Sequence, residues 1–205
     1  YVSKTNKTIV ISTGLSSAKE IENAVKTIEK TKNNKIIILH CVSKYPPNDI
    51  DINLSKIETL KKMYHYPIGF SDHSIGTSIP LASVMLGVKV IEKHFTLDKK
   101  LKGWDHAISA NPDELKFLTH ETKRIARAIG RKELRRVESL TMLKNFRRSC
   151  VASIDLKVGD KLDKSKISFK RPGTGIPPDN LSDIIGKVVK KAIKKDEIIS
   201  LKKLS

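Results

Sequence analysis

The sequence predicts an α/β fold with a parallel sheet, followed by a small β-rich module, and three observations support this fold class. Between residues 8 and 130, four short apolar runs alternate with helical segments. In each of these units, polar residues collect at the end of the apolar run. After Gly130, glycines and prolines such as those of "PGTG" and "IPP" interrupt the chain too often for long helices. Successive strand–helix pairs imply parallel strands joined by helical crossovers.

The first two units follow from the pattern of apolar residues. "TIVISTG" at residues 8–14 is a β-branched run that ends in glycine, so we expect a strand there. Ser17 and Glu20 have the spacing of a capping box, and the helix that they begin carries its apolar residues on one face. Residues 35–43 form a continuous apolar run, as expected for a parallel strand buried on both sides. Residues 53–64 can form the next helix.

The last two units repeat this order. We expect a third strand at residues 67–74 and a helix at residues 77–87, whose small residues would allow close packing. Residues 88–96 are expected to form the fourth strand. The longest helix is predicted at residues 111–130, where Asn111 has the position of the N-cap.

The polar strand ends favour one α/β architecture. The turn after the first strand, "STGLSS", lacks the GxGxxG pattern of a Rossmann-like sheet. A (β/α)8 barrel, in contrast, builds its active site at the carboxyl ends of its strands. Four units make half of such a barrel. Because the first residue is Tyr1 and a strand is expected from residue 8, we expect the chain to be a fragment of a longer protein.

The composition limits the classes of function without choosing one. The chain has 205 residues, of which 39% are hydrophobic, and no apolar run reaches the roughly 18 residues that a membrane span needs. Cys41 and Cys150 belong to no local spacing motif, which is typical of free thiols in a reducing compartment. We therefore expect a cytoplasmic protein with no membrane partner.

The net charge of +18 leaves three interpretations open. Residues 131–205 carry +11 and residues 1–130 carry +7, so the excess is not confined to one tail. Nucleic-acid binding is one interpretation, although only 5% of the residues are aromatic. An anionic small substrate or a lysine-biased genome explains the charge equally well.

Two histidines are expected at neighbouring strand ends. The alternation of side chains along a strand puts Ser71 and His73 on one face, and Glu92 and His94 on the same face of the last strand. Adjacent strands lie roughly 4.8 Å apart, so two such histidines can share a metal ion. Two protein ligands leave positions open for water and substrate, which suits Mn²⁺, Mg²⁺ or Co²⁺ used as a Lewis acid. The alternative is that each histidine is a hydrogen-bonded structural residue.

Seven stretches of the chain, in this order, resemble the sialic acid synthase family, whose members condense phosphoenolpyruvate with an N-acylated mannosamine-type sugar. The resemblance implies that residues 1–130 are the second half of a TIM barrel. Residues 131–147 are charged, and we expect a linker or a short helix there. The resemblance also implies that residues 148–205 are an antifreeze-like (SAF) domain that covers a partner subunit's active site in a domain-swapped homodimer. The matching stretches are "ISTG", "LHCVSKYPP", "GFSDHSIGTSIPLAS", "LGVKVIEKHFTLD", "GWDHAISANPDEL", "RRSCVASIDLKVGDKL" and "KRPGTGI".

The resemblance also implies roles for single residues. His73 in "SDH" and His94 in "EKH" are similar to the family's two ligands of a divalent metal, with Mn²⁺ the expected ion. The metal's implied role is to polarise the aldehyde oxygen of the sugar. Ser12, Ser43 and Ser71 match positions that line the phosphoenolpyruvate site, where hydroxyls can bond a carboxylate or a phosphate.

The sugar-binding positions have simpler alternatives beside them. Tyr45 and Asp105 match residues that hold sugar hydroxyls, and Arg171 matches an arginine that reaches the N-acyl group across the dimer interface. Tyr45 can instead pack in a turn, Asp105 can hold a loop, and Arg171 can be a surface charge. Ser12 can cap the following helix. Glu92 faces the expected site and can orient a metal ligand from behind.

Two departures from the family bear on the sugar, and one bears on activity. Some members have asparagine at the position of Ser43, and most have "GPDH" where this chain has "GWDH". "KRPGTGI" with "DHAIS" is closer to the N-acetylneuraminate and legionaminate synthases than to the pseudaminate branch. The family's first four strands have no counterpart in residues 1–205, so we expect this chain alone to be inactive. A carbohydrate-binding module without catalysis is the alternative function, and nucleic-acid binding is disfavoured.

Overall fold

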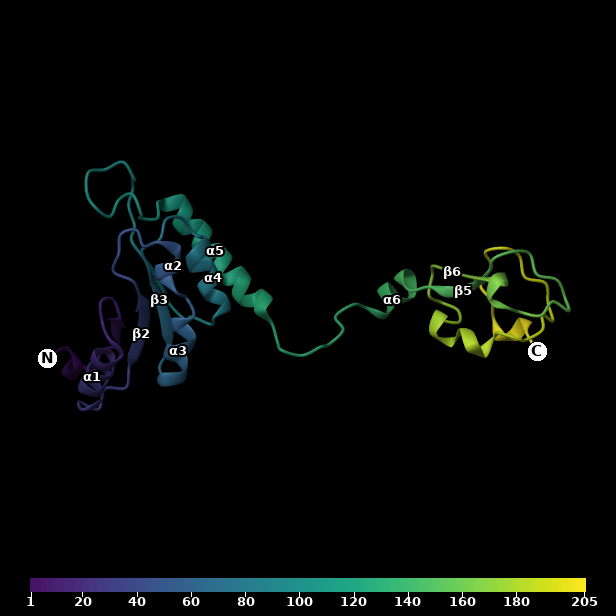
Figure 1. The fold of residues 1–205 in the computed structure, drawn as a ribbon, viewed down its shortest axis with the longest axis horizontal. Helices are drawn as coiled ribbons and strands as arrows, with labels where there is room; N and C mark the ends of the chain where they lie inside the picture. The colour runs from purple at the N-terminus through teal and green to yellow at the C-terminus, as the bar shows by residue number, and fades with distance from the viewer. The chain divides into compact units, whose positions relative to one another are not determined.

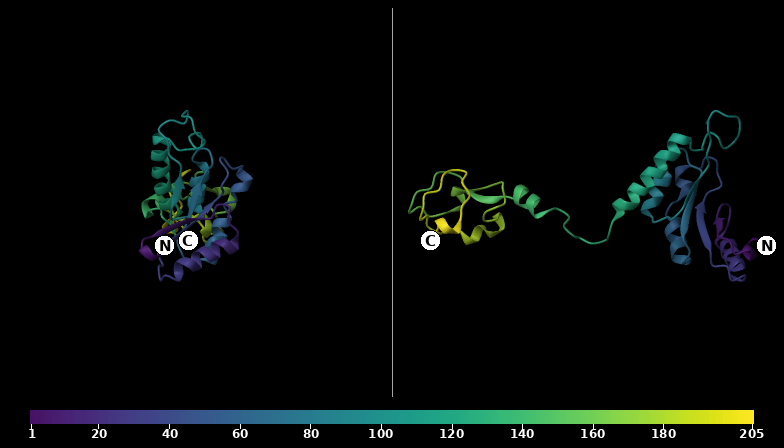
Figure 2. Two further views of the ribbon diagram at one scale, coloured as in Figure 1. Left: turned by 90° about the vertical axis from the view of Figure 1, so that its left-hand side faces the viewer. Right: turned by 180° about the vertical axis from the view of Figure 1, so that it is seen from behind.

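The computed structural model describes residues 1–205, which form two compact units, Tyr1–Lys132 and Glu133–Ser205. Figure 1 labels their helices and strands, and Figure 2 shows them from two further sides. No helix combines the length and the apolar character needed to cross a membrane. Both cysteines, Cys41 and Cys150, are buried free thiols.

The first unit is built on a four-stranded parallel sheet with the strand order β1-β2-β3-β4, which confirms the predicted parallel α/β fold. The strands are β1 (Ile9–Ser12), β2 (Ile36–Cys41), β3 (Ile68–Asp72) and β4 (Ile91–Lys93). The helices are α1 (Ala18–Glu29), α2 (Asp49–Ile52), α3 (Lys56–Met63), α4 (Ser78–Met85) and α5 (Pro112–Ile129), after a short 3-10 helix, η1 (Val2–Thr5).

Each strand pairs with the next one along the chain, and this order puts the helices on one face of the sheet. Right-handed crossovers that always step in the same direction keep their helices on the same side. The core agrees, because Val25 of α1 and Ile57 of α3 belong to the same apolar cluster as Ile38 and Phe70 of the strands. Figure 1 shows α4 beside α5, and these two helices are in contact.

The other face of the sheet changes character along the strands. Val10 and Leu39 lie within β1 and β2, whereas Ser71 and His73 lie at the carboxyl end of β3, and Glu92 and His94 at that of β4. The register pairs Ser71 with Glu92. Polar side chains of different strands therefore meet at one edge of the sheet.

The second unit has little regular structure but a core of its own. The strands β5 (Ser149–Ala152) and β6 (Ile167–Lys170) are antiparallel, and single bridges such as Leu156 to Ile193 connect the remaining chain. Buried residues including Leu156, Leu162 and Ile193 form the core. Three short 3-10 helices complete the unit: η2 (Lys164–Lys166), η3 (Pro178–Asp183) and η4 (Leu201–Lys203).

Residues 131–147, predicted to form a linker or a short helix, contain the helix α6 (Leu140–Phe146). Ser139 caps this helix by accepting a hydrogen bond from the Met142 amide. At the other end, the Gly173 amide donates to the Lys144 carbonyl over 2.6 Å. This hydrogen bond connects the helix to the loop that follows β6.

Candidate active site

The ends of β3 and β4 bring His73 and His94 together. His73 directly follows Asp72, the last residue of β3, and His94 directly follows Lys93, the last residue of β4. Because Asp72 and Lys93 are partners in the parallel register, the two imidazoles project side by side, with ring centroids 5.1 Å apart. The expectation that both lie on one face of the sheet agrees with this placement.

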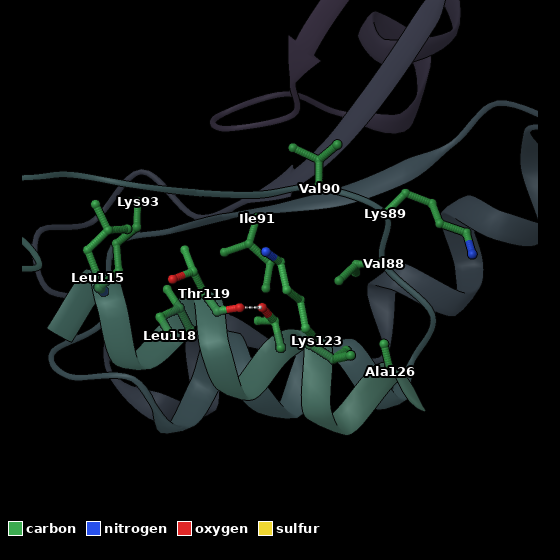
Figure 3. Close-up of a pocket in the computed structure, with 12 residues that line it drawn as sticks. Val88, Lys89, Val90, Ile91, Lys93, Leu115, Leu118, Thr119, Lys123 and Ala126 are labelled. Atoms are coloured by element: carbon green, nitrogen blue, oxygen red, sulfur yellow. Dashed lines mark hydrogen bonds between the residues drawn. The ribbon is translucent and has the colours of Figure 1, made fainter. Parts of the chain in front are cut away.

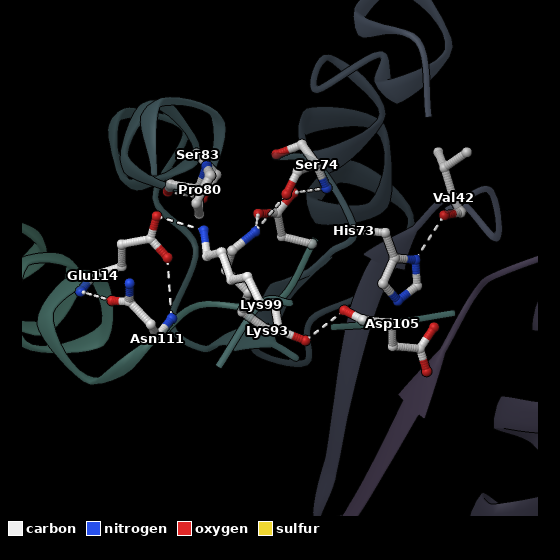
Figure 4. A network of polar contacts seen from close by, with 12 residues as sticks. Val42, His73, Ser74, Pro80, Ser83, Lys93, Lys99, Asp105, Asn111 and Glu114 are labelled. Atoms are coloured by element: carbon white, nitrogen blue, oxygen red, sulfur yellow. Dashed lines mark hydrogen bonds and ion pairs between the residues drawn. The ribbon is translucent and has the colours of Figure 1, made fainter. Parts of the chain in front are cut away.

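The His73 ring turns its Nδ1 toward β2 and the residue after it, where it faces the Val42 carbonyl and, at 4.0 Å, the sulfur of Cys41. Its Nδ1 lies 2.9 Å from the carbonyl oxygen of Val42, and since that oxygen can only accept, Nδ1 carries the proton. The Nε2 atom of this tautomer therefore has a free lone pair, and it makes no hydrogen bond within the chain. His73 is buried, with 7% of its surface exposed. Figure 4 shows the contact between the ring nitrogen of His73 and Val42 as a dashed line.

His94 is more open than His73 and faces a carboxylate. Its Nδ1 lies 3.7 Å from Oδ2 of Asp105, which is too far for a hydrogen bond but close enough for electrostatic attraction. The Asp105 loop is fixed by Ser109, whose hydroxyl and amide both donate to the Asp105 carbonyl. The sequence assigned Asp105 to sugar hydroxyls, and the structure places its carboxylate beside one of the two imidazoles.

Tyr45 covers both histidines. Its ring lies 4.1 Å from the His73 ring and meets the His94 ring edge-on at 5.7 Å, measured between centroids. Desolvation is the main cause that raises the pKa of the Tyr45 phenol, so its hydroxyl stays protonated at neutral pH and can donate a hydrogen bond. The Tyr45 ring therefore lies against both imidazoles of the candidate site.

Ser71 and Glu92 form a polar pair beneath the histidines. The Ser71 hydroxyl donates to Glu92 over 2.7 Å, across neighbouring strands. Glu92 makes no hydrogen bond to either imidazole, so the structure gives no direct contact for its expected role behind a metal ligand. A pocket of about 250 Å³ is lined by Ser71, Asp72, His73, Glu92, Lys93 and His94.

Ser12 and Ser43 extend the polar edge toward β1. The suggestion that Ser12 caps α1 is wrong, because Ser17 is the N-cap and forms the capping box with Glu20. Ser43 lies against the turn after β1, where a Cβ atom on Gly14 would sit only 2.3 Å from its hydroxyl oxygen. The absence of a side chain at Gly14 is therefore what lets Ser43 approach this turn.

Arg171 belongs to the second unit and is held by α6. Its Nε donates to the carbonyl of Phe146 over 2.9 Å, and its guanidinium carbon lies 5.3 Å from the centre of the Phe146 ring. The two terminal nitrogens of the guanidinium make no hydrogen bond within the chain. Ser149 steadies the following loop by donating to the Pro172 carbonyl and accepting from the Gly175 amide.

Two buried charges escaped the sequence reasoning. Lys93 and Asp72 form an ion pair of 2.6 Å on the side of the sheet that faces the helices, with 3% and 1% of their side chains exposed. The alternation that put Ser71 and His73 on one face also put Asp72 on the other, and Lys93 has the matching position on β4. Two opposite charges inside adjacent apolar strands were the signal that could have revealed the pair.

A larger hollow lies on the helix-covered side of β4, where Lys93 is one of its lining residues. It measures about 410 Å³ and is enclosed by α4, β4 and α5 (Figure 3). Its lining is mainly apolar, with Val84, Val88, Ile91 and Leu118 among its residues. Three lysines, Lys89, Lys93 and Lys123, also line it, but no histidine or carboxylate does, so the strand-end edge remains the candidate site.

The donors at this edge fit a divalent ion held by two imidazoles. No group of three or more His, Cys, Asp or Glu side chains is arranged around one point. His73 offers a free Nε2, and the neighbouring His94 lies within reach of the same ion. An ion bound here would take its remaining ligands from water or substrate, which is the pattern of a catalytic rather than a structural site.

Comparison with known proteins assigns both units. The NeuB family matches residues 1–134 and the SAF domain matches residues 147–205. An uncharacterized protein of Methanocaldococcus jannaschii is 43% identical over 97% of this chain and 59% of its own length. The N,N'-diacetyllegionaminic acid synthase of Campylobacter jejuni is 38% identical over 97% of this chain and 60% of its own length.

Solved structures give the same result. The N-acetylneuraminic acid (sialic acid) synthetase of Leptospira borgpetersenii is 46% identical, with a TM-score of 0.62 over 69% of this chain and 48% of that one. The spore coat polysaccharide biosynthesis protein SpsE of Bacillus subtilis is 31% identical, with a TM-score of 0.60 over all of this chain and 63% of that one. The chain thus spans about 60% of the two curated relatives named above. It belongs to the NeuB family and carries a SAF domain.

Proposed function

We propose that this chain is part of a synthase that condenses phosphoenolpyruvate with N-acetylmannosamine or a related N-acylated sugar. The observation that carries the proposal is the placement of two imidazoles 5.1 Å apart at adjacent strand ends, one of them with a free Nε2. Family membership supports it, as do relatives named as N,N'-diacetyllegionaminic acid synthase and N-acetylneuraminic acid synthetase. The product would be a nine-carbon 2-keto sugar acid, with release of phosphate.

In this proposal the first unit is the second half of a (β/α)8 barrel. The consecutive order of the four parallel strands supports this, as does the collection of polar side chains at their carboxyl ends. In the complete barrel, the face that carries Val10 and Leu39 would point toward the interior. Further βα units, in the same polypeptide or in another one, would supply the remaining groups that grip phosphoenolpyruvate.

His73 and His94 would hold a divalent metal, with Mn²⁺ the first choice and Mg²⁺ or Co²⁺ as alternatives. When bound, such an ion would act as a Lewis acid on the carbonyl oxygen of the sugar. The chain's own residues would keep the two rings in place: the Val42 carbonyl fixes the tautomer of His73, and the Tyr45 ring packs on both imidazoles. Tyr45 would also offer a protonated hydroxyl to the sugar.

The three serines would bind phosphoenolpyruvate. Ser12 ends β1, Ser43 follows β2 and Ser71 lies near the end of β3, so their hydroxyls are spread along the polar edge. They would hydrogen-bond the carboxylate or the phosphate. Carbon 3 of phosphoenolpyruvate would then form a bond with the aldehyde carbon, whose oxygen takes up a proton. Water would add to carbon 2, and the bond from carbon 2 to the phosphate oxygen would break.

Two further groups would recognise the sugar. Asp105 beside His94 would accept hydrogen bonds from sugar hydroxyls, and the free guanidinium nitrogens of Arg171 would bind the N-acyl group. Arg171 would act on the active site of a partner subunit in a domain-swapped homodimer, in a cytoplasmic enzyme. The stretches "KRPGTGI" and "DHAIS" favour an N-acetylneuraminate-type or legionaminate-type product.

Binding of Mn²⁺ to the 205-residue chain tests the centre of this proposal. Wild type is expected to bind one ion, and His73→Ala or His94→Ala is expected to weaken binding by at least about 100-fold, since outer-shell partners alone contribute about 10- to 100-fold. His120→Ala is the matched control, because this histidine lies exposed on α5. Electron paramagnetic resonance of free Mn²⁺ gives the affinity.

Equal affinity in wild type and both alanine variants would refute the shared site. A turnover assay with phosphoenolpyruvate and N-acetylmannosamine tests the half-barrel separately. We expect no turnover by the 205-residue chain, and appreciable release of phosphate would show that these residues suffice. Sugar binding without turnover, in a protein that also holds the complementary βα units, would favour the carbohydrate-binding alternative.

A further inference from the structure

A buried ion pair lies directly behind the two histidines, on the opposite side of the sheet. The Lys93 ammonium lies 2.6 Å from the Asp72 carboxylate and 2.6 Å from the carbonyl oxygen of Ser74. The other carboxylate oxygen of Asp72 accepts from the Ser74 amide over 2.9 Å. Lys93 therefore contacts the residue before His73 and the residue after it, as Figure 4 shows in part.

Lys93 is also the immediate neighbour of His94. The Lys93 side chain thus connects the backbone next to His94 with the two residues on either side of His73, Asp72 and Ser74. The ladder between β3 and β4 ends at the Asp72–Lys93 pair, and no main-chain hydrogen bond joins His73 to His94. Beyond the ladder, the Lys93 side chain links the two strand ends by polar contacts, while the Tyr45 ring packs on both imidazoles from outside.

We propose that Lys93 is a positioning residue, whose ammonium, bound to Asp72 and Ser74, sets the separation of the His73 and His94 imidazoles. The inference rests on the proposed metal site, and it adds a residue that would touch neither metal nor substrate. The stability of the fold does not require this ion pair, because replacing a buried ion pair by apolar residues of similar volume often leaves the stability unchanged or raises it. The ion pair would instead fix the position of one strand end relative to the other.

A second ion pair in the same unit, Lys99 with Glu114, differs from the Lys93–Asp72 pair in its exposure to solvent. Lys99 and Glu114 also lie 2.6 Å apart, but 29% and 30% of their side chains are exposed. Glu114 already accepts a hydrogen bond from the Asn111 amide at the start of α5. This pair lies away from both imidazoles, so its loss is expected to leave their separation unchanged.

The decisive variant removes both charges and keeps the shapes. In Asp72→Asn/Lys93→Met, the asparagine oxygen can still accept from the Ser74 amide, and methionine fills the space of the lysine stem. We expect Mn²⁺ affinity to fall about 10- to 100-fold, the scale of outer-shell partners, while the midpoint of thermal unfolding stays within a few degrees of wild type. Lys99→Met is the control and is expected to change neither quantity.

A readout without metal separates this inference from the metal proposal. Nuclear Overhauser contacts between the rings of His73 and His94 are expected in wild type and in Lys99→Met, and are expected to be lost in the double variant. If wild type binds no Mn²⁺, the metal proposal fails, and the ring contacts still test the role of Lys93. Unchanged ring contacts, or unchanged affinity in the double variant, would overturn the inference.

A single substitution tests the carboxylate by itself. Asp72→Asn leaves the Lys93 ammonium buried without its opposite charge, so its midpoint of thermal unfolding is expected to fall below that of the double variant. It is expected to weaken Mn²⁺ binding less than the double variant does. Weaker binding in Asp72→Asn with unchanged ring contacts would contradict a role that acts through the separation of the histidines.

Discussion

The two units place their candidate functional side chains by different means. In the first unit, the register of parallel strands decides which groups meet, as when Ser71 faces Glu92 and His73 lies beside His94. In the second unit, Arg171 follows the end of β6, and hydrogen bonds to α6 and around Ser149 hold its loop. Substitutions in the first unit should therefore act through the strands, and those in the second unit through single loop contacts.

The largest expected effect concerns the strand core of the first unit. Phe70→Ala removes a ring that is 2% exposed and stacks on His40, and it should lower the free energy of unfolding of this unit by about 3–5 kcal/mol. Amide hydrogen exchange across β2 and β3 measures this loss. Phe117→Ala on α5, where the ring is half-exposed, is the control. A loss as small as in the control would mean that strand packing does not dominate this unit.

A smaller effect is expected from one hydroxyl in the second unit. Ser149→Ala leaves the Pro172 carbonyl and the Gly175 amide without their partner, which should cost about 1–3 kcal/mol. Exchange of the β5 amides measures the cost. Ser182→Ala, at an exposed position, should change little. If both variants behave alike, loop hydrogen bonds do not set the geometry near Arg171.

The smallest effect is a difference in alkaline behaviour, since all four tyrosines belong to the first unit. Desolvation raises the pKa of Tyr45, Tyr64 and Tyr66. These groups prefer the protonated form in the folded state, so their stabilisation is complete below pH of about 10 and is lost as pH rises through the raised pKa values. Phenolate absorbance should therefore appear at higher pH in the native chain than in urea. Superimposed titration curves would contradict this, and Tyr66→Phe should reduce the difference.

Much of the first unit follows from the sequence because its signals are periodic. Apolar runs and capping residues such as Ser17 and Asn111 predict the elements, and alternation predicts the shared face of His73 and His94. The ion pair of Asp72 and Lys93 was missed, although alternation implied it, because pairing two charges requires the register of the strands. Periodicity does not give the register.

Loops mark the limit of prediction in both units. Tyr45 lies in the segment after β2, where no repeat indicates that its ring packs on two imidazoles. In the second unit, frequent glycines and prolines predict short elements, but the isolated bridges that assemble its core join residues far apart in sequence. Arg171 is similar: its contact with Phe146 joins the residue after β6 to a helix 25 residues earlier, and no sequence pattern indicates that pairing.

The close approach of Ser43 to Gly14 has a consequence for sequence variation. A Cβ atom at residue 14 would lie 2.3 Å from the Ser43 oxygen and 3.3 Å from the Cys41 sulfur, so no larger residue fits while both side chains stay in place. The two positions are therefore not free to drift separately. Exchange of Gly14 would force the Ser43 hydroxyl to rotate away, since the Ser43 Cβ at 3.6 Å leaves room for the added carbon, and the orientation of this hydroxyl is thus tied to the turn after β1.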